Sequence, residues 1–145
     1  NNCELPGMPR ATHGHAPHQF IDEGDKIVLI SDEFNVPRTI YMNSTANPAD
    51  RPGSPLGHSV GRWEDDRTLL VETSRIDFPY LDLSGAGQSE AVTIVERYVL
   101  GEDEARIDYR VTITDPVMLT QPYVKTGVWL DLDEAMGVYD CVVVN

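Results

Sequence analysis

Basic side chains are scarce in this 145-residue sequence, which has 11 Lys and Arg against 24 Asp and Glu and a net charge of −13 at pH 7. A surface this acidic repels the phosphates of nucleic acids and anionic membranes, so we expect neither as a partner. Long apolar runs are absent, and none approaches the roughly 18–20 residues of a membrane-spanning helix. With 41% hydrophobic residues, the chain predicts one domain, residues 1–145, around a single core.

Cysteine occurs only twice, at Cys3 and Cys141, which is neither a zinc-ligand spacing nor a redox pair. A disulfide between them would close a loop of nearly the whole chain and would persist in an oxidising compartment, whereas two unrelated buried thiols are the alternative. No Gly-rich phosphate loop or dinucleotide fingerprint is present, so we expect no cofactor. The abrupt start at Asn1 is typical of a protein trimmed of its signal peptide, which predicts export to the periplasm or the extracellular space.

Helical periodicity is missing as well, while short β-rich runs alternate with clusters of turn residues. The expected strands are 26–34, 38–42, 58–64, 68–76, 91–100, 105–114, 123–132 and 137–144, with a proline-rich loop over 43–56. In the run 105–114, apolar and polar residues alternate, as a sheet with one buried face demands. The pattern predicts an all-β fold, a single calycin- or lipocalin-like antiparallel β-barrel of eight or nine strands, closed and therefore without exposed edges.

The stretch 57–66, GHSVGRWEDD, carries more chemistry than a strand and its turn require. Side chains two positions apart share a face in a strand, so His58, Arg62 and Glu64 would point the same way. If that face lines the barrel lumen, His58 is the candidate proton-transfer residue, because histidine titrates near neutral pH. Arg62 would then hold developing negative charge, and Glu96 on a later strand would orient one of the two.

Two other interpretations apply to this stretch. Arg62 and Glu96 can instead form a structural ion pair that closes one end of the barrel, with Trp63 in the core. The letters GHSVG also match the G-x-S-x-G elbow of serine hydrolases, but no helix follows them, and Ser59 would face away from His58. We therefore expect no serine hydrolase.

Aromatic side chains are the candidates for ligand contacts, although ordinary core and rim packing explains them equally well. They are Trp63, Tyr80, Tyr98, Tyr109, Tyr123 and Trp129. Three histidines, His13, His15 and His18, stand close together near the N-terminus and are weak candidates for metal ligands. Their spacing matches no strong metal motif, so we expect no metal site.

Several blocks of the sequence together carry a resemblance to a known family. They are Cys3–Arg10 (CELPGMPR), Gly57–Glu64 (GHSVGRWE), Thr68–Thr73 (TLLVET), Leu81-Asp82, Ser89-Glu90, Val95–Tyr98 (VERY), Thr112–Pro116 (TITDP) and Tyr139–Cys141 (YDC). On these blocks the chain resembles, over nearly its whole length, a family of exported bacterial proteins with lipocalin-type barrels and no settled activity. The resemblance implies export and supports pairing Cys3 with Cys141.

The chain departs from that family at three positions. Arg67 is an extra residue in a hairpin turn, and Gln88 and Thr93 stand where the family often has histidine. Chemistry that needs those two histidines is therefore not expected in this protein.

These observations lead to one functional hypothesis and two alternatives. The hypothesis is a cofactor-free enzyme of isomerase, cyclase or lyase type that uses acid–base chemistry on a small, largely apolar or aromatic molecule in the barrel lumen. The first alternative is a lipocalin-type carrier with the same pocket and no turnover. The second is a structural domain whose lumen is filled with side chains. The sequence leaves the oligomeric state open, a homodimer included.

Overall fold

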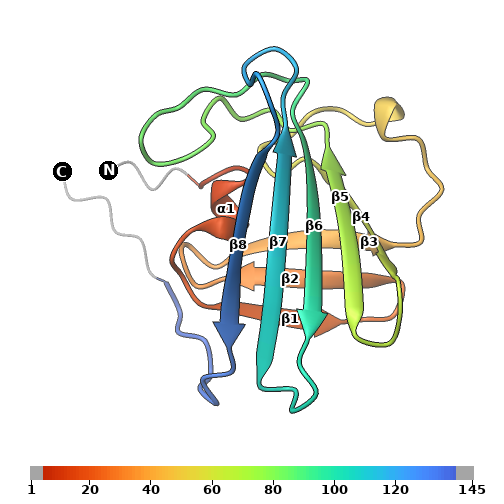
Figure 1. Ribbon diagram of the computed structural model, residues 1–145, viewed down its shortest axis with the longest axis vertical. Helices are drawn as coiled ribbons and strands as arrows, with labels where there is room; N and C mark the ends of the chain where they lie inside the picture. Colours follow the sequence, from red (N-terminus) through yellow and green to blue (C-terminus); the bar gives the residue numbers. More distant parts are fainter. Residues whose placement is uncertain (1–4, 140–145) are drawn as a thin grey trace.

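Residues 5–139 are described in a computed structural model, and they form one curled sheet of eight strands (Figure 1). The strands are β1 (His18–Asp22), β2 (Lys26–Ser31), β3 (Val36–Met42), β4 (His58–Trp63), β5 (Thr68–Ser74), β6 (Thr93–Leu100), β7 (Arg106–Thr114) and β8 (Tyr123–Leu130). The helical elements are α1 (Arg10–His13) and a 3₁₀ turn, η1 (Pro48–Asp50). The predicted all-β class is confirmed. No helix in this part of the chain is long and apolar enough to cross a membrane.

The sheet follows the order of the chain from β1 to β8, and its neighbouring strands are antiparallel except β3 and β4. That pair is parallel because the long loop 43–57 carries the chain back to the end of the sheet at which β3 began. In Figure 1, β1–β3 cross behind β5–β8, so the sheet curls over its own core. Within the described residues β1 and β8 do not pair, so the sheet is a half-barrel and the predicted closure is wrong.

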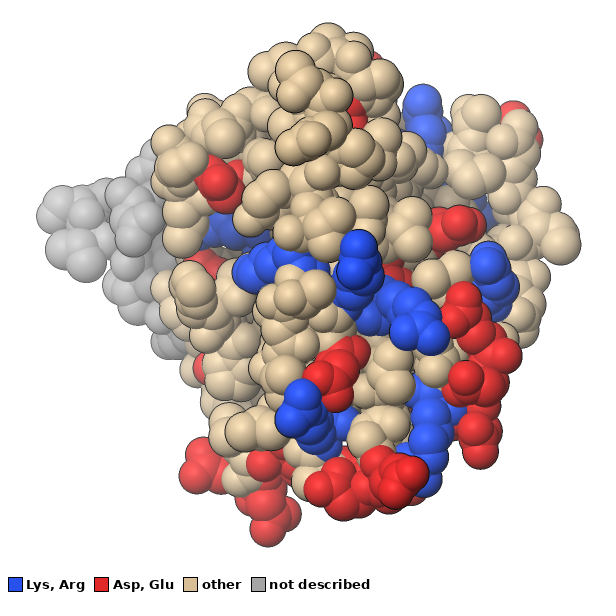
Figure 2. Space-filling model, viewed as in Figure 1, with Lys and Arg blue, Asp and Glu red and all other residues tan. Residues whose placement is uncertain are grey.

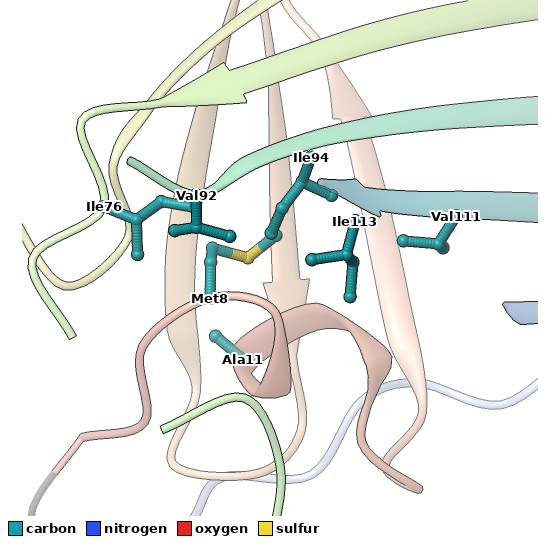
Figure 3. Close-up of a cluster of buried hydrophobic side chains, with 7 residues drawn as sticks. All are labelled: Met8, Ala11, Ile76, Val92, Ile94, Val111 and Ile113. Carbon is teal, nitrogen blue, oxygen red and sulfur yellow. The ribbon is translucent and has the colours of Figure 1, made fainter. Parts of the chain in front are cut away.

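The N-terminal segment packs on the inner side of this half-barrel. Its Met8 and Ala11 lie against strand side chains in one of two hydrophobic clusters, as Figure 3 shows. Lys125 of β8 also donates a hydrogen bond to the backbone oxygen of His13, 2.8 Å away. The segment thus provides core contacts that a closing strand pair would give in a full barrel.

The sequence prediction fails at both ends of the sheet. β1 was not expected, because its histidine and acidic ends resemble a solvated arm. The last expected strand, 137–144, is not formed at 137–139, and its remainder lies outside the described residues. Cys3 and Cys141 also lie outside them, so their disulfide stays a prediction.

Two buried polar side chains, Asp115 of the TITDP block and Gln88, hold loops in place through hydrogen bonds. Asp115, 1% exposed, accepts hydrogen bonds from the backbone N–H and hydroxyl of Ser89, at 2.6 and 2.7 Å. Burial alone would raise the pKa of Asp115, but these bonds outweigh it and hold the pKa below its usual range. Gln88 donates to the carbonyls of Met8 and Phe78, both at 2.8 Å, and so ties the N-terminal segment to a loop.

Candidate functional site

A buried ion pair occupies the middle of the half-barrel. Arg38 on β3 and Glu96 on β6 face inwards, and they are 2% and 0% exposed. Both terminal guanidinium nitrogens of Arg38 contact the carboxylate, at 2.9 and 2.5 Å. This bidentate geometry is the strongest form of the arginine–carboxylate contact.

Hydroxyl groups take the remaining donors of Arg38. Its Nε bonds Ser59 on β4 at 3.1 Å, and its terminal nitrogens reach Thr12 at 3.1 Å and Thr73 at 2.7 Å. All five N–H groups of a guanidinium are therefore satisfied. A buried charge supported in this way keeps its partner fixed, because each rotamer change would break several hydrogen bonds.

The charges of the pair set the titration of its neighbours. Burial alone would raise the pKa of Glu96, but the Arg38 guanidinium and a hydrogen bond from His13 outweigh it, so the pKa lies well below its usual range. Burial and the Glu96 carboxylate both raise the pKa of Tyr98, whose hydroxyl donates to that carboxylate at 3.0 Å. Glu96 is thus a carboxylate, and Tyr98 a neutral phenol, at neutral pH.

His13, at the end of α1, is the residue of this network that can transfer a proton. Its Nε2 lies 2.6 Å from Oε1 of Glu96, and its side chain is 4% exposed. Because a carboxylate only accepts hydrogen bonds, Nε2 carries a proton, and the tautomer with this proton has its bare nitrogen at Nδ1. Within the described residues Nδ1 has no hydrogen-bond partner.

His13 also lines a cavity of about 250 Å³ between α1, the 81–84 loop and strands β7 and β8. Val111, Ile113 and Leu81 form apolar parts of its lining, and Arg10 and Lys125 are its cationic residues. Arg10 is partly neutralised by Glu33, whose carboxylate is 2.9 Å away. Asp82 also lines the cavity, which therefore combines an oriented imidazole, charged groups of both signs and an apolar wall.

The residues predicted to form one catalytic group are not brought together. The faces of β4 alternate as expected, but Ser59 and Gly61 point into the core, so His58 and Arg62 lie on the outer face. Glu96 points inwards, and its arginine partner is Arg38 rather than Arg62. The Ser59 hydroxyl accepts a hydrogen bond from Arg38 inside the core, which is a physical reason why Ser59, and not His58, faces inwards.

His58 and Arg62 occupy two different surroundings on that outer face. The His58 ring lies 5.4 Å from the ring of Tyr41, and burial followed by the charge of Arg51 lowers its pKa. Arg62 is exposed and forms no ion pair within the described chain. Figure 2 shows Lys and Arg side chains in a band across the middle of this face of the sheet.

The predicted aromatic contacts divide into two groups. Tyr98, Tyr109 and Trp129 point inwards and pack together, with ring centroids of Trp129 at 5.5 and 4.8 Å from the two tyrosines. The other three are about half exposed at strand ends or loops; they are Trp63 at 48%, Tyr80 at 51% and Tyr123 at 51%. Of these three, Tyr123 lines the His13 cavity.

The three N-terminal histidines are separated into different settings. His13 binds Glu96, His15 is exposed, and His18 stacks on Trp129 with ring centroids 4.6 Å apart. No group of three or more His, Cys, Asp or Glu side chains within residues 5–139 is arranged to hold a metal ion.

Sequence reasoning missed Arg38 and the role of His13. One signal was present for Arg38, because it alternates with Val36 and Ile40 and so belongs to the inward face of β3. A charged residue at such a position needs a buried partner of opposite charge. The proximity of His13 to Glu96, 83 residues away in sequence, carried no local signal.

Comparison of the chain with models of protein families, with curated proteins and with solved structures finds no match. The family resemblance of the sequence blocks is therefore still a prediction.

Proposed function

We propose that the protein is a cofactor-free acid–base enzyme that moves a proton on a small, largely apolar carbonyl compound. His13 is the base in this proposal, in place of His58, and the cavity beside it holds the substrate. The half-barrel, as a calycin-type barrel left open between β1 and β8, would serve as a rigid frame. Export and the Cys3–Cys141 disulfide stay part of the proposal.

One observation carries this proposal, namely the contact of 2.6 Å between His13 Nε2 and the buried Glu96 carboxylate. A carboxylate that holds one ring nitrogen fixes the tautomer and orientation of the imidazole, and it stabilises the imidazolium that forms during proton transfer. Arg38 keeps Glu96 ionised and in place. Arg38 and Glu96 are therefore positioning residues, and of these three residues only His13 would touch the substrate.

The proposed reaction moves one proton and one electron pair. His13 Nδ1 takes a proton from the carbon next to a carbonyl, and the C–H electron pair shifts so that the carbonyl oxygen becomes an enolate oxygen. In an isomerase, the imidazolium then returns the proton to another carbon of the enolate. In a lyase, the enolate re-forms the carbonyl, a C=C bond forms as a leaving group departs with its bonding pair, and the imidazolium gives that group the proton. Lys125 and Arg10 supply positive charge where the enolate oxygen develops.

Two alternatives use the same structure without turnover. A carrier would hold the same class of molecule in the cavity, and the buried network would only support its wall. A structural domain would use Arg38, Glu96 and Tyr98 as core filling, in keeping with their burial at 2%, 0% and 3% exposure.

Deuterium exchange distinguishes these functions without knowledge of the natural substrate. A panel of small cyclic enones and aryl ketones is incubated with the protein in D₂O, and loss of the α-proton signal is followed by NMR. His13→Gln keeps an N–H donor for Glu96 but removes the base, while His58→Gln is the matched control on the opposite face of the sheet. We expect His13→Gln to slow exchange of a responsive compound roughly 10²- to 10⁴-fold, and His58→Gln to leave it unchanged.

Two outcomes contradict the proposal. If the α-protons of every compound exchange at the rate seen in buffer alone, the protein is not the proposed enzyme. If a compound then binds saturably without exchange, the protein is a carrier. If His58→Gln abolishes exchange and His13→Gln does not, the base is His58 on the outer face of the sheet and not His13.

A further inference from the structure

A second and larger cavity, of about 680 Å³, lies beside β1 and β8. Residues 131–137, which we name the strap, follow β8, and all of them except Asp133 line the cavity. The strap ends at the turn between β2 and β3, where Asn35 Nδ2 donates to the Gly137 carbonyl at 3.2 Å. Asn35 Oδ1 also accepts from the backbone N–H of Tyr139 at 2.6 Å. The strap therefore spans the open side of the half-barrel, and this volume is typical of small-molecule sites.

Three aromatic rings form one wall of this second cavity; His18 and Trp129 are stacked, and Phe20 is tilted against Trp129. The Trp129 ring lies 4.6 Å from His18 and 5.9 Å from Phe20, measured between centroids. Burial, followed by the charge of nearby His13, lowers the pKa of His18 to about 4, so its imidazole is neutral at pH 7. The wall thus presents π faces and carries no positive charge of its own.

Acidic residues are in excess around the same cavity. Asp32, Glu104, Asp131 and Glu134 line it, against the single arginine Arg106, and His15 is the remaining histidine there. The guanidinium of Arg106 is already paired with Asp108, with contacts of 2.9 and 2.6 Å. Figure 2 shows acidic side chains gathered at the lower end of the molecule, where Figure 1 places the β6–β7 turn and the end of β8.

We propose that this cavity binds a small organic cation, a quaternary ammonium compound with an apolar body. A cation placed over an aromatic face of this wall gains from the ring quadrupole, and surrounding carboxylates add attraction without any direct ion pair. An anion would meet repulsion from the acidic residues, and a neutral molecule would gain only from apolar contact. This site is separate from the proposed proton-transfer cavity and does not depend on its function.

The charge of the ligand is tested with two probes of nearly the same shape. Choline carries a quaternary ammonium group, and 3,3-dimethylbutan-1-ol replaces it with a neutral tert-butyl group. The protein carries Trp63→Phe, which leaves Trp129 as the only tryptophan, and its fluorescence reports binding in the cavity. We expect choline to bind roughly 3- to 30-fold more tightly than the neutral alcohol, and its affinity to fall with added salt.

A pair of double variants then tests the acidic lining. Glu104→Gln with Asp131→Asn removes two charges from the cavity, and Glu102→Gln with Asp66→Asn removes two exposed charges that do not line it. The first double variant should weaken choline binding severalfold, while the second should leave it close to wild type. Equal affinity for both probes, equal loss in both double variants, or no saturable binding of choline would overturn the proposal.

Discussion

At the scale of single residues, Arg38 and Glu96 decide most of the chemistry of the core. Removing two charges from water is costly, and the pair is stable only because each donor and acceptor has a partner. The hydroxyls of Ser59, Thr12 and Thr73 supply those partners on one side. His13 and Tyr98 supply them on the other, at the Glu96 carboxylate.

The cost of breaking this pair is the first prediction. Glu96→Gln leaves the Arg38 charge buried without a counter-charge, and we expect it to lower the free energy of unfolding by about 3–5 kcal/mol. Urea titration followed by circular dichroism measures the loss. Glu90→Gln, on an exposed side chain, should change stability little. A Glu96→Gln protein as stable as the wild type would mean that the ion pair is not buried as described.

The pH dependence of stability is the second prediction and concerns His18. Its pKa is about 4 in the folded protein and near 6.5 in an unfolded chain, so acid favours the unfolded state over this interval. Stability is therefore highest above pH 6.5 and falls as the pH drops towards 4. We expect a loss of about 2 kcal/mol from this group, less than the full shift allows because solvent reaches part of the ring.

Substituting His18 isolates its contribution to the pH dependence of stability. His18→Phe keeps a ring against Trp129 but cannot titrate, so its stability should fall less between pH 6.5 and 4. His15→Asn should follow the wild-type curve, because His15 is exposed. Burial also lowers the pKa of His58, which contributes in the same direction in all three proteins. Parallel curves for wild type and His18→Phe would contradict the assignment.

At the scale of elements, the parallel contact between β3 and β4 depends on a glycine. The register places Met42 opposite Gly61 and Ile40 opposite Ser59. A β-carbon on Gly61 would lie 2.7 Å from Ile40 Cγ2 and 2.8 Å from Met42 Sδ, closer than side chains can approach. The glycine of the GRWE block therefore allows the strand to pack tightly on the core.

The third prediction follows from this close approach. Gly61→Ala should lower the free energy of unfolding by about 1–3 kcal/mol, because β3 must shift or its side chains must leave their rotamers. Gly87→Ala is the matched control, since its nearest neighbour is the mobile end of Met118 at 3.2 Å. Thermal unfolding of the two variants gives the comparison. Equal stability of both would contradict the tight contact of β3 with β4.

Two hairpins with a clear sequence pattern were predicted well. The hairpins β4–β5 and β6–β7 have clear alternation and charged turns, and both form as expected. The parallel β3–β4 pair was missed, because packing across the core selects it. The strand β1 was missed although its partner β2 is close in sequence, because its polar ends hide the alternation of a strand. Long-range contacts also limited the prediction of the site. Glu96 was predicted as a site residue, but its partners Arg38 and His13 were missed because they come from distant segments. No local pattern specifies which distant residues meet.

At the scale of the whole molecule, the excess of acid acts on stability. The net charge of −13 produces self-repulsion that a compact fold must overcome. Fourth, we therefore expect the melting temperature to rise when sodium chloride is added from about 0.01 M to about 0.15 M, since the Debye length shortens from roughly 30 to 8 Å. Differential scanning calorimetry measures it. An unchanged or lower melting temperature would mean that local ion pairs outweigh the repulsion.

The tautomer of His13 tests the central claim most directly, because the proposed base exists only if Glu96 holds Nε2–H. Long-range ¹H–¹⁵N NMR of the histidine rings at pH 8 reads which nitrogen carries the proton, and His13→Gln assigns the signals. We expect the tautomer with its proton on Nε2 and a bare Nδ1. A proton on Nδ1, either alone or together with one on Nε2, would contradict this expectation, because Nδ1 would then not be a base.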